Sequence, residues 1–181
     1  MNLYHLNPPV RFHMLAEIEL DRAGDNLYYS TRFNDRGRRH YPELLVEAAK
    51  DGNATSLARE LNQRGCFVHL ERHHRQGRVH TVRVPSTAAQ MFAEGEFNRF
   101  YIRGLCLHAI ERRCAHVEVY RAKPVAEPRR ESEMRIGDLL EPGEVLGDLR
   151  RHPGEKPWLG VPGGIGSGLS VRLRDTAAAA S

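Results

Sequence analysis

The feature that most constrains the fold is a pair of consecutive patterns in the middle of the chain. Between Cys66 and Val84, two short runs with strand character flank Gln76 and Gly77, which match a two-residue hairpin turn. A long helical pattern then follows at once, over about 87–112. We therefore expect an α+β fold with an antiparallel sheet, a projecting β-hairpin at about 66–84 and one long helix.

The turn position predicts the register of the hairpin. With Gln76 and Gly77 as the loop, the cross-strand pairs are His73 with His80, Glu71 with Val82, and Leu70 with Arg83. Apolar residues then lie at the base, and arginines and histidines lie at the tip. A two-stranded ribbon is marginal alone, so its outer half either leans on another surface or stays mobile.

The long helix carries apolar residues on two sides. Such a helix is covered on both sides, either by its own fold or by a partner. We expect self-association to involve three residues of this helix and the single tryptophan, which are Phe92, Ile102, Ile110 and Trp158.

The N-terminal half contains further periodic segments. Alternating apolar residues predict a strand over Arg11–Leu20, which a second strand, Leu27–Phe33, would join as an antiparallel pair. A helix is expected to begin near Tyr41, with Pro42 in its first turn, and a shorter one spans Thr55–Gln63.

The C-terminal part is predicted to be less regular. The expected elements are a strand at His116–Arg121, short helices at Glu131–Leu140 and Pro142–Arg151, an edge strand at Leu169–Leu173 and a frayed tail at Thr176–Ser181. We expect one α+β domain over residues 1–151, followed by a Pro/Gly-rich segment over 152–181.

Composition bounds the class of protein. The 181 residues suffice for one domain with a core, and no run of 18 apolar residues exists, so no membrane span is expected. The first residues lack a signal-peptide pattern. The three cysteines show no CxxC, which is typical of reduced thiols. These features favour a cytoplasmic location, or one within a virion or shell made in the cytoplasm.

Arginine dominates the positive charge. The net charge is +4, and only three of the 27 basic residues are lysine. A GC-rich genome produces the same bias, whereas the clustering of the arginines suits contact with a polyanion. The candidate contacts to nucleic acid are Arg72, Arg75, Arg78, Arg99 and Arg103.

Missing motifs argue against an enzyme. The residues after Lys50, Lys123 and Lys156 are Asp, Pro and Pro, so no P-loop can be written. HExxH and GxSxG are also absent. We expect no cofactor.

Two groups of residues could bind a metal ion. His69, Glu71 and His73 share a strand face with His80 opposite, a set that suits zinc or serves as a plain polar tip. The second group is Cys106, His108, Cys114 and His116. Cys106 and His108 point in different directions on a helix, and Cys114 and His116 share a face only if a strand begins at Cys114. Buried thiols explain those cysteines better.

Three functions remain open. Hypothesis one is a non-enzymatic assembly subunit, because a hairpin arm before a long helix is similar to the arrangement in viral and encapsulin-type shell proteins. The alternative is a nucleic-acid-binding protein that uses the Arg/His hairpin tip. The third is a metal-dependent enzyme or an ADP-ribosyltransferase-like protein, since Glu131-Ser132-Glu133 resembles the ExE of that family.

Overall fold

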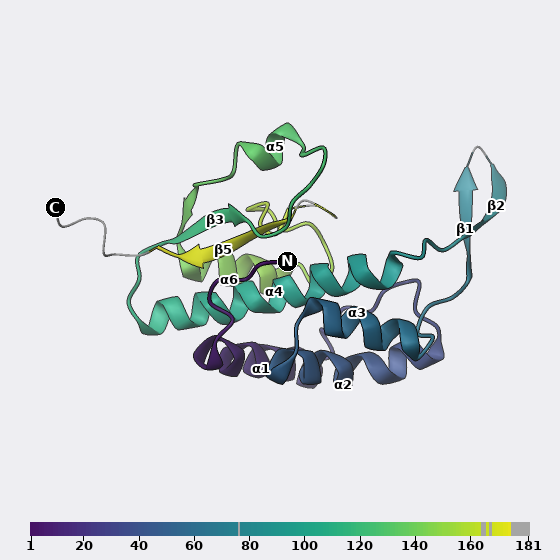
Figure 1. Cartoon of the computed structure of the whole chain (residues 1–181), viewed down its shortest axis with the longest axis horizontal. Helices are drawn as coiled ribbons and strands as arrows, with labels where there is room; N and C mark the ends of the chain where they lie inside the picture. The colour runs from purple at the N-terminus through teal and green to yellow at the C-terminus, as the bar shows by residue number, and fades with distance from the viewer. Residues whose placement is uncertain (76, 164–165, 167, 175–181) are drawn as a thin grey trace. The chain divides into compact units, whose positions relative to one another are not determined.

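The computed structural model describes residues 1–75, 77–163, 166 and 168–174. The chain divides into two compact units, whose helices and strands are labelled in Figure 1. Unit 1 comprises Met1–Leu27 and Asn98–Ser181, and unit 2 comprises Tyr28–Phe97. The expected boundary at residue 151 stays a prediction, and the expected tail over Thr176–Ser181 lies outside the described residues.

The architecture is α+β, as predicted. Unit 1 contains helices α1 (Pro8–Ala23), α5 (Arg130–Glu133) and α6 (Pro142–Arg151), with strands β3 (Val117–Arg121), β4 (Leu139–Leu140) and β5 (Leu169–Leu173). Unit 2 contains helices α2 (Asp35–Asp51) and α3 (Ala54–Gln63), with strands β1 (Leu70–Arg75) and β2 (Arg78–Arg83). The long helix α4 (Ala88–Glu111) belongs to unit 2 up to Phe97 and to unit 1 beyond it.

Helix α1 corrects the strand predicted at Arg11–Leu20. The helix begins at Pro8 because the Asn7 side chain accepts a hydrogen bond from the Val10 N–H, and proline fits the first turn. Its buried positions follow helical spacing and include polar side chains: Val10, His13, Met14, Glu17, Ile18 and Asp21. Alternation of apolar residues was therefore a misleading signal.

Within unit 1, helix α4 packs against α1 on one side and β5 on another. A Cβ added at Gly104 would lie 2.8 Å from the Val10 carbonyl oxygen, so the two helix backbones approach closely there. The Asn98 side chain donates to the Leu169 carbonyl at 2.8 Å. The chain itself therefore covers both sides of this part of the helix (Figure 1).

The sheet of unit 1 is antiparallel, with strand order β4-β3-β5. Strand β3 pairs along five residues with β5, from Val117 opposite Leu173 to Arg121 opposite Leu169. The predicted edge strand is therefore confirmed. The helix expected at Glu131–Leu140 is only one turn long, because Gly137 has a φ of 91° and the chain then joins the sheet as β4.

Buried charges tie α1, α4 and α6 together in unit 1. The Arg103 side chain, 1% exposed, donates Nε–H to Glu17 at 2.7 Å and contacts both carboxylate oxygens of Asp21, at 2.5 and 2.9 Å. Arg150 donates to both oxygens of the same Glu17 carboxylate. Two arginines thus compensate two buried acids.

Unit 2 is built around aromatic rings. Helix α2 begins at Asp35 rather than near Tyr41, because the Asn34 side chain caps the Gly37 N–H and Pro42 lies inside the helix. The strand predicted at Leu27–Phe33 is absent from the described chain except for one bridge, Phe33 with Phe67. The rings that pack together are Phe33, Tyr41, Phe67 and Phe92.

Candidate nucleic-acid interface

The hairpin of β1 and β2 has the register predicted from its turn. His73 lies opposite His80, Glu71 opposite Val82, and Leu70 opposite Arg83. Within the described chain these strands pair only with each other. All six residues of β2 are exposed. In the described part of the hairpin, the outer backbone edge of each strand is therefore unpaired, and the side chains are exposed except at Glu71, which Arg32 contacts.

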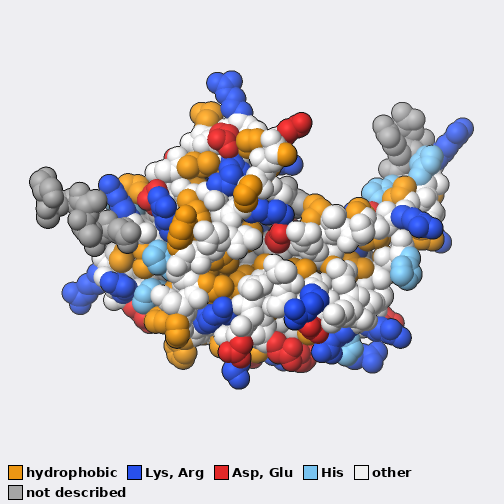
Figure 2. Space-filling model, in the orientation of Figure 1, with side chains coloured by type: hydrophobic (Ala, Val, Ile, Leu, Met, Phe, Trp, Pro, Cys, Tyr) orange, Lys and Arg blue, Asp and Glu red, His pale blue; other side chains and the backbone are white. Residues whose placement is uncertain are grey.

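Alternation along the strands divides the side chains between these faces. Arg72 and Arg83 lie on one face of the hairpin and on opposite strands, Arg72 opposite Thr81 and Arg83 opposite Leu70. Arg78, His73 and His80 lie on the other face. Arg75 is in register with Arg78, and its side chain lies outside the described part of the structure. Figure 2 shows the basic and histidine side chains along the hairpin.

Glu71 is the one acidic residue between positions 61 and 85, a stretch with five arginines and four histidines. The Arg32 guanidinium donates to both of its carboxylate oxygens, at 2.7 and 2.8 Å, and His73 Nε2 lies 3.2 Å from it. Arg32 and then His73 hold the pKa of Glu71 below its usual value. The carboxylate is thus already neutralised, and the remaining hairpin charge is positive.

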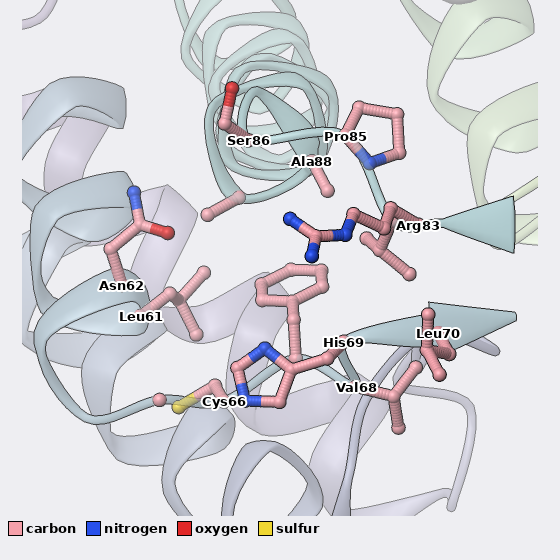
Figure 3. A pocket seen from close by; sticks show the side chains of 14 residues that line it. Leu61, Asn62, Cys66, Val68, His69, Leu70, Arg83, Pro85, Ser86 and Ala88 are labelled. Carbon is pink, nitrogen blue, oxygen red and sulfur yellow. The ribbon is translucent and has the colours of Figure 1, made fainter.

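A groove of about 530 Å³ lies at the base of the hairpin, within unit 2. In Figure 3, the His69 and Arg83 side chains extend into it toward Asn62 of α3. Cys66 lies buried in its wall. Burial raises the pKa of the Cys66 thiol although Arg64 and Arg36 act in the opposite direction, so the thiol stays protonated at neutral pH.

Unit 2 also carries exposed arginines outside the hairpin. Arg36, Arg38 and Arg39 are exposed in the first turns of α2. Unit 2 therefore has exposed basic side chains both on the hairpin and at the start of α2. An anionic surface is the complement of this charge.

Two of the arginines predicted to contact phosphate, Arg99 and Arg103, are buried in unit 1. Arg103 is buried and bound to Glu17 and Asp21. Arg99 is 6% exposed, and its guanidinium donates to the backbone carbonyls of His152 and Glu155 at 2.8 and 2.6 Å. Both arginines hold parts of unit 1 together, so they are not presented to a ligand. Among the predicted contacts, Arg72 and Arg78 have exposed side chains.

The four residues expected to mediate self-association also include both covered and exposed side chains. Ile102 is fully buried, and Phe92 is half-buried and packs against Phe33 with ring centroids 4.7 Å apart. Ile110 is 43% exposed and Trp158 is 80% exposed. The Trp158 ring lies against His152, at 4.7 Å between centroids, while the buried Asp148 carboxylate accepts the Trp158 backbone N–H.

The predicted metal set on the hairpin is not assembled for an ion in the described chain. Arg32 occupies Glu71, and although His73 Nε2 lies 3.2 Å from that carboxylate, His69, Glu71, His73 and His80 supply no three ligand atoms that all lie within 4.8 Å of one another. Three other side chains, which the sequence patterns did not indicate, do place their ligand atoms close enough together for a metal ion.

This second set is His13, His108 and Glu111, whose ligand atoms all lie within 4.8 Å of one another. Burial lowers the pKa of His108, with Arg112 acting in the same direction. The spacing of His108 and Glu111, three residues apart on a helix, was a signal in the sequence. His13 was assigned to a strand, so its place on the helix was hidden.

Comparisons with protein-family models, with curated protein sequences and with solved structures found no match. In the described residues, no helix combines the length and the apolar character needed to cross a membrane.

Proposed function

We propose that this protein is a non-enzymatic nucleic-acid-binding protein whose hairpin is its main contact. One observation carries the proposal: an exposed two-stranded ribbon on which the single acid is already bound by Arg32 and the other charged residues are basic. A ribbon of this width fits the major groove of duplex DNA, and its six-residue strands are about 20 Å long.

Cations on both faces suit a ribbon that lies between two phosphate backbones. Arg72 lies on one face and Arg78 on the other, so each face offers a guanidinium to phosphate oxygens, and Arg83 extends into the groove at the base. Arg36, Arg38 and Arg39 are further exposed cations of unit 2. Phosphate contacts of this kind give affinity without requiring a specific base sequence.

The experiment is a fluorescence-anisotropy titration of labelled duplex DNA and single-stranded RNA at several salt concentrations. We expect the triple variant Arg72→Gln/Arg78→Gln/Arg83→Gln to bind at least about 10-fold more weakly, with a smaller salt dependence. The matched control is Arg129→Gln/Arg151→Gln/Arg174→Gln, which removes three exposed arginines from unit 1. Equal losses in both variants, or no binding at low salt, would contradict the proposal.

Self-association is the second candidate, and a specific observation favours it. Leu70, Val79 and Val82 are 55%, 55% and 40% exposed on a hairpin with two free strand edges. Free edges accept further strands, and apolar side chains strengthen such contacts. The assembly into a viral or encapsulin-like shell remains a proposal on the same hairpin. The positive charge of the arms opposes their direct pairing, which is why nucleic acid is placed first.

Size-exclusion chromatography with light scattering, with and without nucleic acid, separates the two candidates. The assembly candidate predicts an oligomer in the absence of nucleic acid that dissociates when Val79→Lys/Val82→Lys is introduced. The nucleic-acid candidate predicts a larger mass only when nucleic acid is added. A monomer under both conditions excludes assembly.

A further inference from the structure

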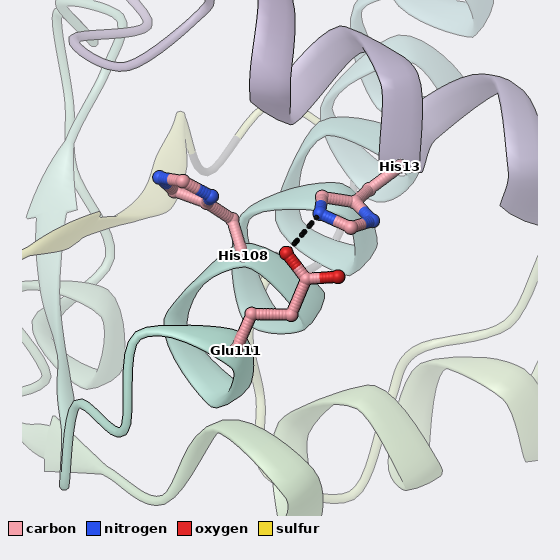
Figure 4. Close-up of side chains that lie close together, drawn as sticks. All are labelled: His13, His108 and Glu111. Carbon is pink, nitrogen blue, oxygen red and sulfur yellow. Dashed lines mark hydrogen bonds and ion pairs between the residues drawn. The ribbon is translucent and has the colours of Figure 1, made fainter.

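A second site lies in unit 1, on residues that the proposed nucleic-acid contact does not use. His13 of α1 and His108 and Glu111 of α4 are brought together where these two helices run side by side (Figure 4). We propose that the three side chains bind one divalent cation of the zinc type, with a fourth coordination position left open.

The packing of α1 on α4 brings the ligands together. His13 meets Glu111, while Glu17 and Asp21 meet Arg103, so residue numbers rise along one helix as they fall along the other. Gly104 allows this antiparallel pair to approach closely. His108 and Glu111 are three positions apart on α4 and therefore share a face.

The distances suit a metal ion after a small side-chain movement. His13 Nε2 and Glu111 Oε2 are 3.0 Å apart, and the third ligand atom lies within 4.8 Å of both. Tetrahedral zinc with bonds of 2.0–2.2 Å places its ligand atoms about 3.4 Å from one another. The Glu111 side chain is 64% exposed and free to turn, whereas the His13 side chain is 9% exposed and fixed by packing.

The donor atoms select the class of ion. Two imidazole nitrogens and one carboxylate oxygen are the ligands of many zinc sites, and cobalt and nickel accept the same set. Magnesium and calcium prefer oxygen ligands throughout. A His13–Glu111 ion pair alone would account for two residues but not for His108, whose ring centroid lies 6.1 Å from that of His13.

The test is a titration of the metal-free full-length chain with Zn²⁺ and with Co²⁺, by calorimetry and visible absorption. We expect one ion per chain, and a cobalt spectrum without a thiolate charge-transfer band. Glu111→Gln and His108→Ala should each weaken Zn²⁺ binding by more than about 10-fold, since even residues that only orient ligands cost that much. Circular dichroism checks that both variants fold.

Two controls test the other histidine groups. His116→Ala removes an exposed imidazole beside Cys114 in unit 1, and His73→Ala/His80→Ala removes the hairpin pair. Both should bind Zn²⁺ as the parent chain does. The proposal is overturned if no stoichiometric ion binds, if folded Glu111→Gln binds with unchanged affinity, or if either control abolishes binding.

Discussion

Glu17 shows how one residue joins several elements of unit 1. Its carboxylate on α1 accepts hydrogen bonds from Arg103 of α4 and Arg150 of α6. Burial by itself would raise the pKa of Glu17, but the hydrogen bonds from Arg150 and Arg103 outweigh it and hold the pKa below the usual 4.5. The ionised form is therefore favoured by folding.

The pH dependence follows from the sign of this shift. A carboxyl group whose pKa is lowered in the folded state contributes stability above its ordinary value near 4.5, and that stability is lost as the pH falls through the folded value. We predict that Glu17→Gln lowers the free energy of unfolding at pH 7 by roughly 3 kcal/mol, because the buried Arg103 and the partly exposed Arg150 both lose a charged partner. The variant should also lose less stability on acidification than the parent.

Urea denaturation at a series of pH values from about 7 to 3 measures both effects. The control is Glu19→Gln, which removes an exposed carboxylate from the same helix. If Glu17→Gln and Glu19→Gln have the same stability and the same acid dependence, the buried network does not stabilise the fold as described.

At the scale of elements, helix α4 contains two glycines with opposite environments. A Cβ at Gly95 would meet no atom within 4 Å, whereas one at Gly104 would lie 2.8 Å from the Val10 carbonyl oxygen and 2.9 Å from the Met14 nitrogen. Glycine in a helix interior costs about 0.5–1 kcal/mol relative to alanine. The same substitution is therefore expected to act in opposite directions at the two positions.

We predict that Gly95→Ala raises the free energy of unfolding by about 0.5–1 kcal/mol and that Gly104→Ala lowers it by roughly 1–3 kcal/mol. Thermal and urea unfolding of the two variants measure this, and each variant serves as the other's control for the change in helix propensity. A stabilised Gly104→Ala protein would show that α1 and α4 do not approach closely at that glycine.

The elements also show what the sequence could and could not reveal. The hairpin register followed from two turn residues, Gln76 and Gly77, and α4 and α6 followed from long or well-capped local patterns. Helix α1 was missed because His13, Glu17 and Asp21 lie on its buried face. Those residues look exposed until Arg103, more than 80 positions away, is placed beside Glu17 and Asp21.

The candidate sites were likewise predictable where they depend on local sequence and not where they depend on distant residues. The hairpin arginines were found locally, because strand alternation alone places them on open faces. Arg99 and Arg103 looked similar in sequence, yet their partners are distant residues that bury them. The His13–His108–Glu111 site forms only when α1 packs against α4. The sequence therefore indicated only the three-residue spacing of His108 and Glu111 on α4.

At the scale of the whole molecule, the two compact units share one continuous helix. Helix α4 passes from unit 2 into unit 1 after Phe97 without a break. Unfolding either unit removes packing from one part of this helix, and helix formation is cooperative along the chain. We therefore expect the two units to unfold together.

Trp158 allows a direct check, because it is the single tryptophan and reports on unit 1. Its fluorescence and the far-ultraviolet circular dichroism of the whole chain should give coincident thermal transitions. Phe33→Leu, in the aromatic cluster of unit 2, should move both transitions to lower temperature by the same amount. A tryptophan transition that stays in place would show that the units are independent.

The exposed hairpin also affects how this protein can change over generations. Every residue of β2 faces outward, and the aromatic cluster and the Arg103 network are built from other parts of the chain. Substitutions at Arg78 or His80 can therefore alter what is bound while both cores keep their packing. Binding preference and folding stability depend on separate sets of residues. Selection can therefore change the binding preference without lowering the stability.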